Sequence, residues 1–296
     1  MTDSLALRPL SPKLGVEVLD LDLKQVDGAL FAALHEALVI HSALLLRDQS
    51  LSHADLLAFS RRFGRLDRPP VMERGRTAVE GYPEIYVISN IAGPDGAPIG
   101  SLGAGEADWH TDMSHLPVPP FVSLLYAHEV PPSGGDTWLS SMKAAYAALP
   151  EPLRREIQGL SIKHDGTYNS GGFLRAGERQ SDDPRDSVGQ PHPIVCAHPE
   201  SGEPVLYLGR RRNAYVIGME LAQSEALLDR LWSYAVDPAH SLAHAWRVGD
   251  VLAWDNRATL HRRDAFDPQS RRLLTRTQVK GSRAPAAYGP TAAAPA

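Results

Sequence analysis

Short apolar runs alternate with polar and glycine-rich stretches along the chain, and these runs follow two different periods. Residues 27–39 place apolar side chains at the 3.6-residue spacing of an amphipathic helix. Residues 42–47, SALLLR, contain an uninterrupted apolar run, ALLL, that is typical of a buried strand. A second helix is expected over 53–64, because Ser52 can cap its start and Gly64 can end it. The first part of the chain is therefore predicted to mix helices and strands.

Short strands dominate the rest of the pattern. The runs that predict them cover 82–90, 109–115, 121–130, 193–198, 204–209, 250–256 and 271–281. Helices are expected over 141–160, with a break at Pro150, and over 223–236. Many short strands with helices inserted between them favour an antiparallel jelly roll over a parallel sheet. The predicted fold class is mainly β with α insertions, in a single domain over residues 1–283.

Three polar segments interrupt this pattern. Residues 92–106 are rich in glycine and proline and are expected to form a loop. Residues 165–190 form a longer polar segment, and a structureless segment of this length inside a domain is often an active-site lid. Residues 284–296 have low complexity and are expected to be disordered.

Composition excludes several classes of partner. The chain has 296 residues and a formal net charge of −5, and its only basic cluster is the short run 210–212, so nucleic acid is not an expected partner. No apolar stretch approaches the ~20 residues that span a membrane. The N-terminus lacks the pattern of a signal peptide, and Cys196 is the only cysteine, so no internal disulfide can form. A reducing, cytoplasmic location is expected.

Two short sequences place a histidine and an aspartate two positions apart. His53 and Asp55 lie in a predicted helix, where residues two apart point about 200° around the axis and cannot share an ion. His110 and Asp112 lie in a predicted strand, where such residues leave the same face about 6.6 Å apart at their Cα atoms. The second pair can therefore reach one cation, although polar residues on an exposed strand face show the same spacing.

The C-terminal part of the chain supplies a third candidate ligand. His261 follows a predicted strand and turn, and its imidazole would complete a set of two nitrogens and one carboxylate. Such a set leaves adjacent positions of an octahedral Fe(II) open for a chelating co-substrate and O2. Arg272 and Arg276 are four residues apart and are expected on one face of the next strand. A guanidinium there can bind a carboxylate through two parallel hydrogen bonds.

Three motifs occur in a fixed order: WHTD (109–112), PPSGGDT (131–137) and WDNRATLH (254–261), with Arg272 eleven residues after the histidine. Because of these motifs and their order, the sequence resembles the taurine and chlorophenoxyacetate dioxygenase family. The resemblance extends from about residue 8 to residue 282. The resemblance implies a double-stranded β-helix of the clavaminate-synthase type. It also implies an enzyme that uses Fe(II), 2-oxoglutarate and O2 to hydroxylate a small, anionic substrate such as an aryloxy acid or a sulfonate, with release of succinate and CO2.

The resemblance assigns roles to individual residues. Arg272 would hold the distal carboxylate of 2-oxoglutarate, and the Thr137 hydroxyl would donate a hydrogen bond to the same group. Arg276 would reach toward the iron pocket and contact 2-oxoglutarate or the anionic group of the substrate. The iron ligands would be His110, Asp112 and His261.

The substrate contacts are harder to derive. Family members that act on taurine carry a histidine and a tyrosine after an early FG turn, and segment 63–72, FGRLDRPPVM, lacks both, so taurine is not expected. Glu106 stands where those members carry an amide and would favour a substrate with an ammonium or another donor group. Arg210 would supply a cation for a carboxylate. Further candidates flank the predicted lid and the strands beside the pocket: Asn90, Tyr168, Asn169 and Tyr215.

Two other functions use the same residues. A zinc hydrolase needs two histidines, an aspartate and a bound water, but hydrolysis has no use for a second carboxylate and therefore none for Arg272. A non-catalytic jelly roll would bind 2-oxoglutarate or another ligand without turnover, but it would not need an intact His–Asp–His set. A homo-oligomer is compatible with the resemblance, without an interface that the sequence identifies.

Overall fold

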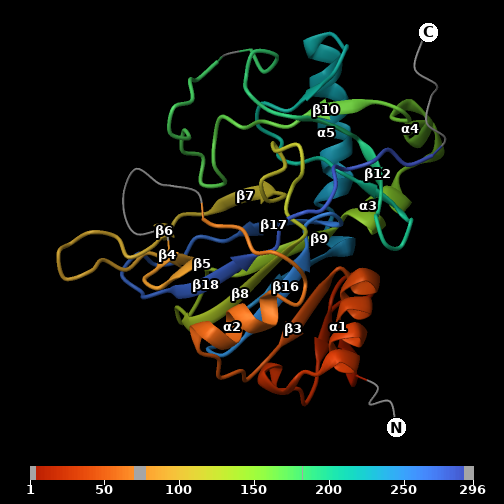
Figure 1. Cartoon of the computed structure of the whole chain (residues 1–296). Coiled ribbons are helices and arrows are strands. Elements are labelled where there is room, and N and C mark those ends of the chain that lie inside the picture. The colour runs from red at the N-terminus through yellow and green to blue at the C-terminus, as the bar shows by residue number, and fades with distance from the viewer. Residues whose placement is uncertain (1–4, 70–77, 182, 290–296) are drawn as a thin grey trace.

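The computed structural model describes residues 5–69, 78–181 and 183–289, and two β-sheets that face each other form its centre (Figure 1). Over these ranges the larger sheet has nine strands, in the order β1-β2-β3-β16-β8-β18-β5-β4, with β6 paired to β5. The pairs β2–β3 and β5–β6 are parallel, and the other pairs described in this sheet are antiparallel. Its strands are β1 Leu7–Pro9, β2 Val16–Val18, β3 Ala43–Leu46, β4 Ala78–Val79, β5 Tyr82–Ser89, β6 Ser101–Leu102, β8 Val122–Glu129, β16 Val251–Asp255 and β18 Leu273–Gln278.

The smaller sheet has the order β15-β9-β17-β7 and, in the described part of the chain, four strands. Successive strands alternate between the two sheets, since β7, β9, β15 and β17 belong to the smaller sheet while β8, β16 and β18 belong to the larger one. This winding is that of a jelly roll, so the predicted fold class is confirmed. The strands of the smaller sheet are β7 Ala107–His110, β9 Thr137–Ser141, β15 Ser241–His244 and β17 Thr259–Arg263.

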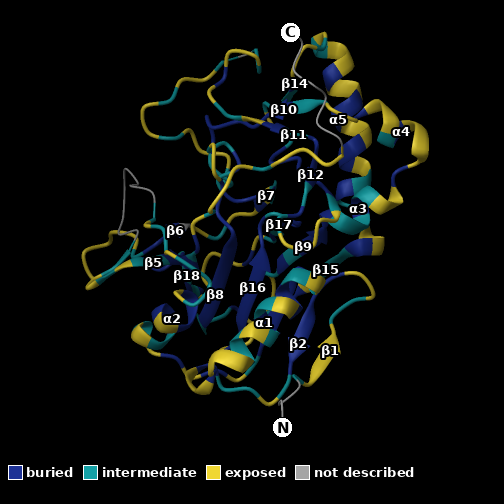
Figure 2. Ribbon diagram, turned by 45° about the vertical axis from the view of Figure 1, so that its right-hand side comes forward, coloured by how far each residue is buried: buried dark blue, intermediate teal, exposed yellow. Residues whose placement is uncertain are grey.

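The central strands β3 and β16 of the larger sheet are buried on both faces, whereas its edge strand β1 is exposed (Figure 2). In β3, Ala43 and Leu45 pack between the sheets, in a cluster that also holds Trp254 of β16. Leu44 and Leu46 point the other way and pack under the first two helices. Because successive side chains of a strand leave opposite faces, a strand covered on both sides needs an uninterrupted apolar sequence, as SALLLR has.

The first two helices cover the outer face of the larger sheet. Helix α1 spans Gly28–His41, and its cap Asp27 accepts a hydrogen bond from the Leu30 N–H over 2.8 Å. Helix α2 spans His53–Ser60, and Ser52 caps its start as predicted; Ser52 and Asp55 together form a reciprocal capping box. The predicted end of this helix at Gly64 is too late, because the chain continues as turns after Ser60.

The remaining helices lie on the other side of the sheets, with α5 at the top and α1 at the bottom of Figure 1. The predicted break at Pro150 is confirmed, since this residue caps the start of α4. These helices pack with two small sheets and with Leu260 of β17. No described helix has the length and apolar character to cross a membrane. The elements are α3 Met142–Ala148, α4 Glu151–Glu156, α5 Leu221–Ala235, β10 Ser161–Lys163, β11 Pro191–Pro193, β12 Val195–Ala197, β13 Pro204–Leu206, β14 Tyr215–Val216 and the 3-10 turns Leu23–Gln25 and Pro238–His240.

Two of the predicted loop segments can be compared with the structure. Residues 165–190 form bends and turns, without a helix or a strand among those described (all except residue 182). The predicted disorder from residue 284 is wrong for 286–288, because Ala197 N–H donates to the Ala286 carbonyl and Tyr288 N–H donates to the Val195 carbonyl. The free edge of β12 supplies backbone partners that sequence complexity does not reveal. Residues 290–296 lie outside the described residues.

Candidate metal centre

Two neighbouring strands bring the predicted histidine ligands together. Strands β7 and β17 pair antiparallel, and His261 lies directly opposite His110 in their register. The two imidazole rings have centroids 4.1 Å apart and are tilted by 45°. Both side chains are buried, with 6% and 7% of their surface exposed. Residues distant in the chain therefore meet because the jelly roll places their strands side by side.

The aspartate reaches the histidines from a turn, and not from a strand. The expected strand over 109–115 ends at His110, and the chain turns through Met113, which has a positive φ of 47°. The argument that both side chains leave one strand face is therefore wrong for Asp112. The turn nevertheless places Asp112 Oδ1 3.8 Å from His110 Nε2 and 3.7 Å from His261 Nε2.

The three ligand atoms suit a single divalent metal. They lie within 4.8 Å of one another, and within residues 5–69, 78–181 and 183–289 no other group of three or more His, Cys, Asp or Glu residues does so. Ligands about 2.1 Å from one ion lie at most ~4.2 Å apart, and both carboxylate–imidazole distances satisfy this limit. The other histidine–aspartate pair, His53 and Asp55, lies in α2 as predicted, and Asp55 takes part in the helix cap.

Electrostatics keep the three groups in the protonation states that a metal requires. Burial lowers the pKa of His110 well below its ordinary value, and the neighbouring His261 is the second-largest cause. Burial lowers the pKa of His261 to about 4. Burial opposes ionisation of Asp112, but Arg276 and the two imidazoles bring its pKa below the ordinary value. His110 Nδ1 lies 2.7 Å from the Asp108 carbonyl, which only accepts, so Nδ1 carries the proton and Nε2 is free for a metal.

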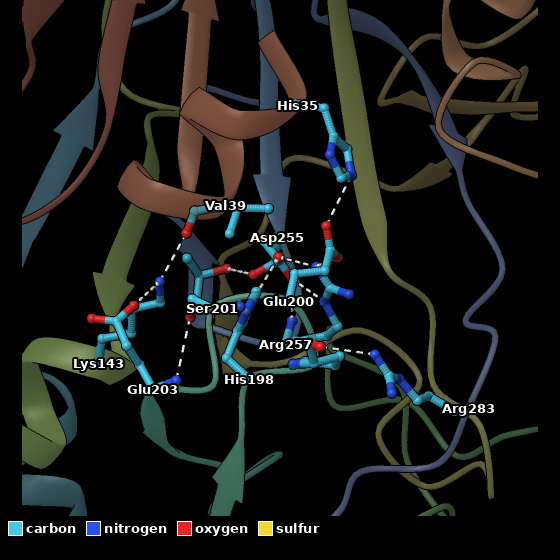
Figure 3. A network of polar contacts seen from close by, with 12 residues as sticks. His35, Val39, Lys143, His198, Glu200, Ser201, Glu203, Asp255, Arg257 and Arg283 are labelled. Atoms are coloured by element: carbon cyan, nitrogen blue, oxygen red, sulfur yellow. Dashed lines mark hydrogen bonds and ion pairs between the residues drawn. The ribbon is translucent and has the colours of Figure 1, made fainter. Parts of the chain in front are cut away.

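A network of ion pairs holds the turn that leads into β17 (Figure 3). Asp255 accepts from the Arg257 backbone N–H over 2.8 Å and from its Nε over 2.9 Å, and His198 Nε2 lies 3.0 Å from the same carboxylate. Arg257 also pairs with Glu200, which contacts His35 of α1. Burial opposes ionisation of Asp255, but Arg257 and His198 lower its pKa. Asp255 therefore holds the turn that leads into β17.

Arg272 lies in a buried position at the glycine turn. Its exposed fraction is 1%, its Nη2 donates to the Gly135 carbonyl over 3.2 Å, and its Nε has no partner among the described residues. Burial lowers its pKa to about 9, and the nearby Arg263 adds to this effect. Gly134 and Gly135 both have positive φ, and a Cβ on Gly135 would lie 3.2 Å from Arg272 Nε. The turn PPSGGDT therefore leaves a cationic donor available for an anion.

Thr137 follows this turn at the start of β9 and is buried. Its hydroxyl oxygen accepts from Trp246 Nε1 over 3.0 Å. Because indole Nε1 only donates, the hydroxyl proton of Thr137 remains for an acceptor. A threonine and an arginine thus both supply donors close to the glycine turn.

Arg276, which the sequence places on the same strand, contacts the metal cluster directly. Its Nη2 lies 2.8 Å from Asp112 Oδ2, and the Ser123 hydroxyl donates to the same oxygen over 2.7 Å. Oδ1 is therefore the oxygen that faces both imidazoles. Asp112 is arranged to bind a metal through one oxygen.

The candidate substrate residues fall into two groups: those linked to the cluster through Arg210, and those whose side chains are exposed or hydrogen-bonded to other residues. Arg210 forms an isolated bridge with His110 and donates from Nη1 to the carbonyls of Tyr168 and Asn169 over 2.6 and 2.8 Å. The side chain of Asn169 accepts from Gly171 and Phe173 N–H within its own loop. The other group comprises Glu106, whose side chain is exposed, Asn90, which bonds to Pro268, Ser270 and Arg272, and Tyr215, whose hydroxyl donates to Met219.

One cationic residue near the cluster was missed from the sequence. Arg175 lies in the segment 165–190, and its Nε donates to the Tyr168 carbonyl over 3.2 Å. Burial lowers its pKa, and the carboxylates of Asp165 and Asp112 and the phenol of Tyr86 act against that shift. Arg175 and Arg210 donate to the same Tyr168 carbonyl, and Arg210 forms a backbone bridge with His110, so Arg175 lies on the side of its segment that faces the cluster. An arginine within a long polar loop has no periodic signal, so only its place in the predicted lid could have indicated it.

The fold and the cluster define a jelly-roll protein in which two histidines and one carboxylate converge so that they could hold one metal ion. The chain belongs to the family described as "Taurine catabolism dioxygenase TauD, TfdA family", whose model matches residues 6–278. Members of this family depend on 2-oxoglutarate and O2 with a metal, so the predicted family and enzyme class are confirmed. This family membership rules out the zinc hydrolase alternative. A non-catalytic jelly roll is not favoured either, because the His–Asp–His set is intact and its three side chains meet.

Named relatives span nearly the whole chain. The (S)-phenoxypropionate/alpha-ketoglutarate-dioxygenase of Delftia acidovorans is 32% identical over 295 residues, which cover 95% of this chain and 97% of the relative. The alpha-ketoglutarate-dependent 2,4-dichlorophenoxyacetate dioxygenase of Cupriavidus pinatubonensis is 34% identical over 281 residues, 92% of this chain and 96% of the relative. The crystal structure of a taurine dioxygenase from Burkholderia xenovorans superposes with a TM-score of 0.77 at 32% identity and covers 97% and 96% of the two chains.

Proposed function

We propose that the chain is an Fe(II)- and 2-oxoglutarate-dependent dioxygenase that hydroxylates a small organic carboxylate, such as an aryloxy acid. The observation that carries this proposal is the meeting of His110 Nε2, His261 Nε2 and Asp112 Oδ1 next to several buried guanidinium groups. Two imidazoles and a carboxylate on one face of a metal are the ligand set of non-haem Fe(II) oxygenases. Relatives that act on phenoxypropionate and 2,4-dichlorophenoxyacetate support the substrate class.

The co-substrate would be held at its far end by Arg272 and Thr137. Arg272 has an Nε–H without a described partner, and Thr137 has a hydroxyl proton without a described acceptor. Both groups are buried, so a carboxylate between them would be shielded from water and bound by charge-assisted hydrogen bonds. When bound, iron with 2-oxoglutarate and O2 supplies the oxidative decarboxylation that hydroxylates a C–H bond.

Three guanidinium groups would orient an anionic substrate beside the cluster. Arg276 contacts Asp112, and Arg210 is close enough to His110 and His261 to act on the pKa of both. Arg175 adds a third positive charge from the segment 165–190. This excess of positive charge favours a substrate carboxylate and disfavours an ammonium group.

The segment 165–190 would act as the lid of the site. It carries Phe173 and Leu174, which are 66% and 47% exposed, and its Arg175 donates to the Tyr168 carbonyl that also accepts from Arg210. Closing over a substrate would bury this apolar surface and exclude water from the reacting carbon. Exposed apolar side chains on a polar loop are difficult to explain if the loop is only a connection.

Taurine is not proposed as the substrate. The segment 63–72 lacks the histidine and tyrosine expected for taurine, and residues 70–72 of it lie outside the described residues. Glu106, the candidate for recognition of an ammonium group, has an exposed side chain.

A cytoplasmic location and a homo-oligomer stay predictions. Burial raises the pKa of the Cys196 thiol to about 12, and a buried free thiol is compatible with a reducing compartment.

A substrate screen tests the proposal. Purified protein is supplied with Fe(II), 2-oxoglutarate and O2, and succinate is measured with aryloxy acids, sulfonates, alkyl sulfates and amino acids. We expect aryloxy carboxylates to raise succinate release above the rate without substrate, in proportion to hydroxylated product. Succinate release that depends only on a cationic or neutral compound would contradict the proposed substrate class.

A further inference from the structure

A chain of hydrogen bonds leads from the core between the two sheets to the carboxylate of Asp112. Trp254 Nε1 donates to Asn256 Oδ1 over 2.9 Å, and Asn256 Nδ2 donates to Ser123 Oγ over 3.0 Å. Ser123 Oγ lies 2.7 Å from Asp112 Oδ2. Gln278 Nε2 also donates to Ser123 Oγ, over 3.2 Å. None of the substrate, co-substrate or metal contacts argued above includes these donors, apart from the last bond to Asp112.

The chemistry of the groups fixes the direction of every bond in this chain. An indole Nε1 can only donate, so Asn256 must present its carbonyl oxygen to Trp254 and its amide NH2 to Ser123. A hydroxyl oxygen has two acceptor sites and one proton. The amides of Asn256 and Gln278 occupy both acceptor sites of Ser123, so its proton must point to Asp112 Oδ2.

Burial makes this arrangement difficult to replace with water. Ser123 is fully buried, and Trp254 and Asn256 are each 1% exposed. A buried donor that loses its partner cannot recover the hydrogen bond from solvent. Asn256 is held on both sides, because the neighbouring residues Asp255 and Arg257 form the ion-pair network of the same turn (Figure 3).

We propose that Ser123 and Asn256 are positioning residues that reserve Oδ1 of Asp112 for the metal. Oδ2 receives two donors, the Ser123 hydroxyl and Arg276 Nη2, while Oδ1 faces both imidazoles. A carboxylate held in this way binds through one oxygen and cannot rotate to chelate through two. Single-oxygen binding leaves the adjacent coordination positions open that a chelating co-substrate and O2 need.

Metal binding without any substrate tests this inference. Co(II) is titrated into the metal-free full chain, and its affinity is measured by calorimetry and its coordination by visible absorption. Ser123→Ala is expected to weaken Co(II) binding by roughly 10–100-fold, as for other residues that orient metal ligands, and to change the absorption bands. Ser224→Ala, a buried serine of α5 that accepts only from the Val216 N–H, is the matched control. It should bind Co(II) with the affinity of the wild type.

A double-mutant cycle separates positioning from general destabilisation. Because Asn256 acts through Ser123, Asn256→Leu should weaken Co(II) binding in the wild type but have no further effect in Ser123→Ala. The inference would be overturned if Asn256→Leu reduced Co(II) affinity by the same factor in the wild type and in Ser123→Ala. It would also be overturned if Ser123→Ala bound Co(II) with wild-type affinity and unchanged absorption. Thermal unfolding of the metal-free variants confirms that each is folded. The titration needs no organic substrate, so its failure is distinct from failure of the proposed aryloxy acid specificity.

Discussion

The guanidinium of Arg272 donates to the carbonyl of Gly135, across a turn in which both glycines have positive φ. This contact uses one of the five N–H donors of the arginine, and Nε points to no described partner. A buried guanidinium with an unused donor is costly in the absence of an anion. The glycine turn and Arg272 together therefore form the half of the site that binds 2-oxoglutarate in our account.

Replacing this arginine with lysine should weaken co-substrate binding without removing the metal. Arg272→Lys keeps a positive charge but loses the planar fork, so we expect the KM for 2-oxoglutarate to rise by about 10–100-fold, the equivalent of one hydrogen bond to a charged group. Co(II) affinity should stay within a factor of two or so of the wild type. The matched control is Arg271→Lys, because Arg271 is exposed and pairs with Glu129 over 2.7 Å. A similar KM change in both variants would contradict the assignment.

The two His-x-Asp sequences provide an internal comparison for the metal ligands. Asp112→Ala removes one ligand of three and should abolish detectable metal binding and succinate formation. Asp55→Ala removes the capping box of α2 and should leave both unchanged. Metal content of the purified variants, measured by atomic emission after reconstitution, distinguishes them. Full metal occupancy in Asp112→Ala would show that this carboxylate is not a ligand.

Arg175 should contribute to substrate binding and not to co-substrate binding. We expect Arg175→Gln to raise the KM for an aryloxy acid roughly tenfold, the value of a single partly exposed charge contact, while the KM for 2-oxoglutarate stays constant. Arg179→Gln changes an exposed arginine of the same segment and serves as the control. Steady-state kinetics with each co-substrate varied separately measures both constants. If the KM for 2-oxoglutarate rises instead, Arg175 belongs to the co-substrate site.

The network around Asp255 should make stability depend on pH. Asp255 has a lowered pKa in the folded chain, so its charge stabilises the fold above the ordinary carboxyl pKa of about 4, and this contribution disappears as the pH falls below that value. Asp255→Asn should lower the free energy of unfolding at neutral pH by about 3–5 kcal/mol, as expected for one partner of a buried ion pair.

Denaturant unfolding of both proteins between pH 7 and pH 3 checks this dependence. The gap between wild type and Asp255→Asn should narrow as the pH falls. Glu151→Gln, which breaks an exposed pair with Arg155, should change stability by less than ~1 kcal/mol at every pH. A gap that is constant with pH would mean that the lost hydrogen bonds, and not the charge, explain the effect.

Local patterns in the sequence were sufficient for most of the fold. The run SALLLR indicated a buried strand, Ser52 marked the start of a helix, and Pro150 marked the break between two helices, as the structure has them. Tail residues 286–288 were predicted incorrectly because their order depends on the free edge of β12, a partner distant in the chain. Backbone pairing between distant segments leaves no signal in the composition of either segment.

The candidate metal ligands were predicted for a partly incorrect reason. His110 and His261 meet because β7 and β17 pair in register, which the motif order suggested only through resemblance. Asp112 was placed on a strand face, but it reaches the cluster from a turn. Ser123 carried a usable signal, because it is a polar residue inside the apolar run FVSLLYAHEV. Arg175 carried none, because loop residues approach a site through the path of the chain and follow no period.

We infer that His110, Asp112 and His261 bind one metal ion, which 2-oxoglutarate also chelates. Anaerobic titration of Fe(II) into the metal-free protein with 2-oxoglutarate tests this inference, because the iron chelate of this keto acid has a visible charge-transfer band. We expect a band that saturates at one Fe(II) per chain and is absent in His261→Ala. A band of the same intensity in His261→Ala, or no band in the wild type, would refute the assignment of the ligands.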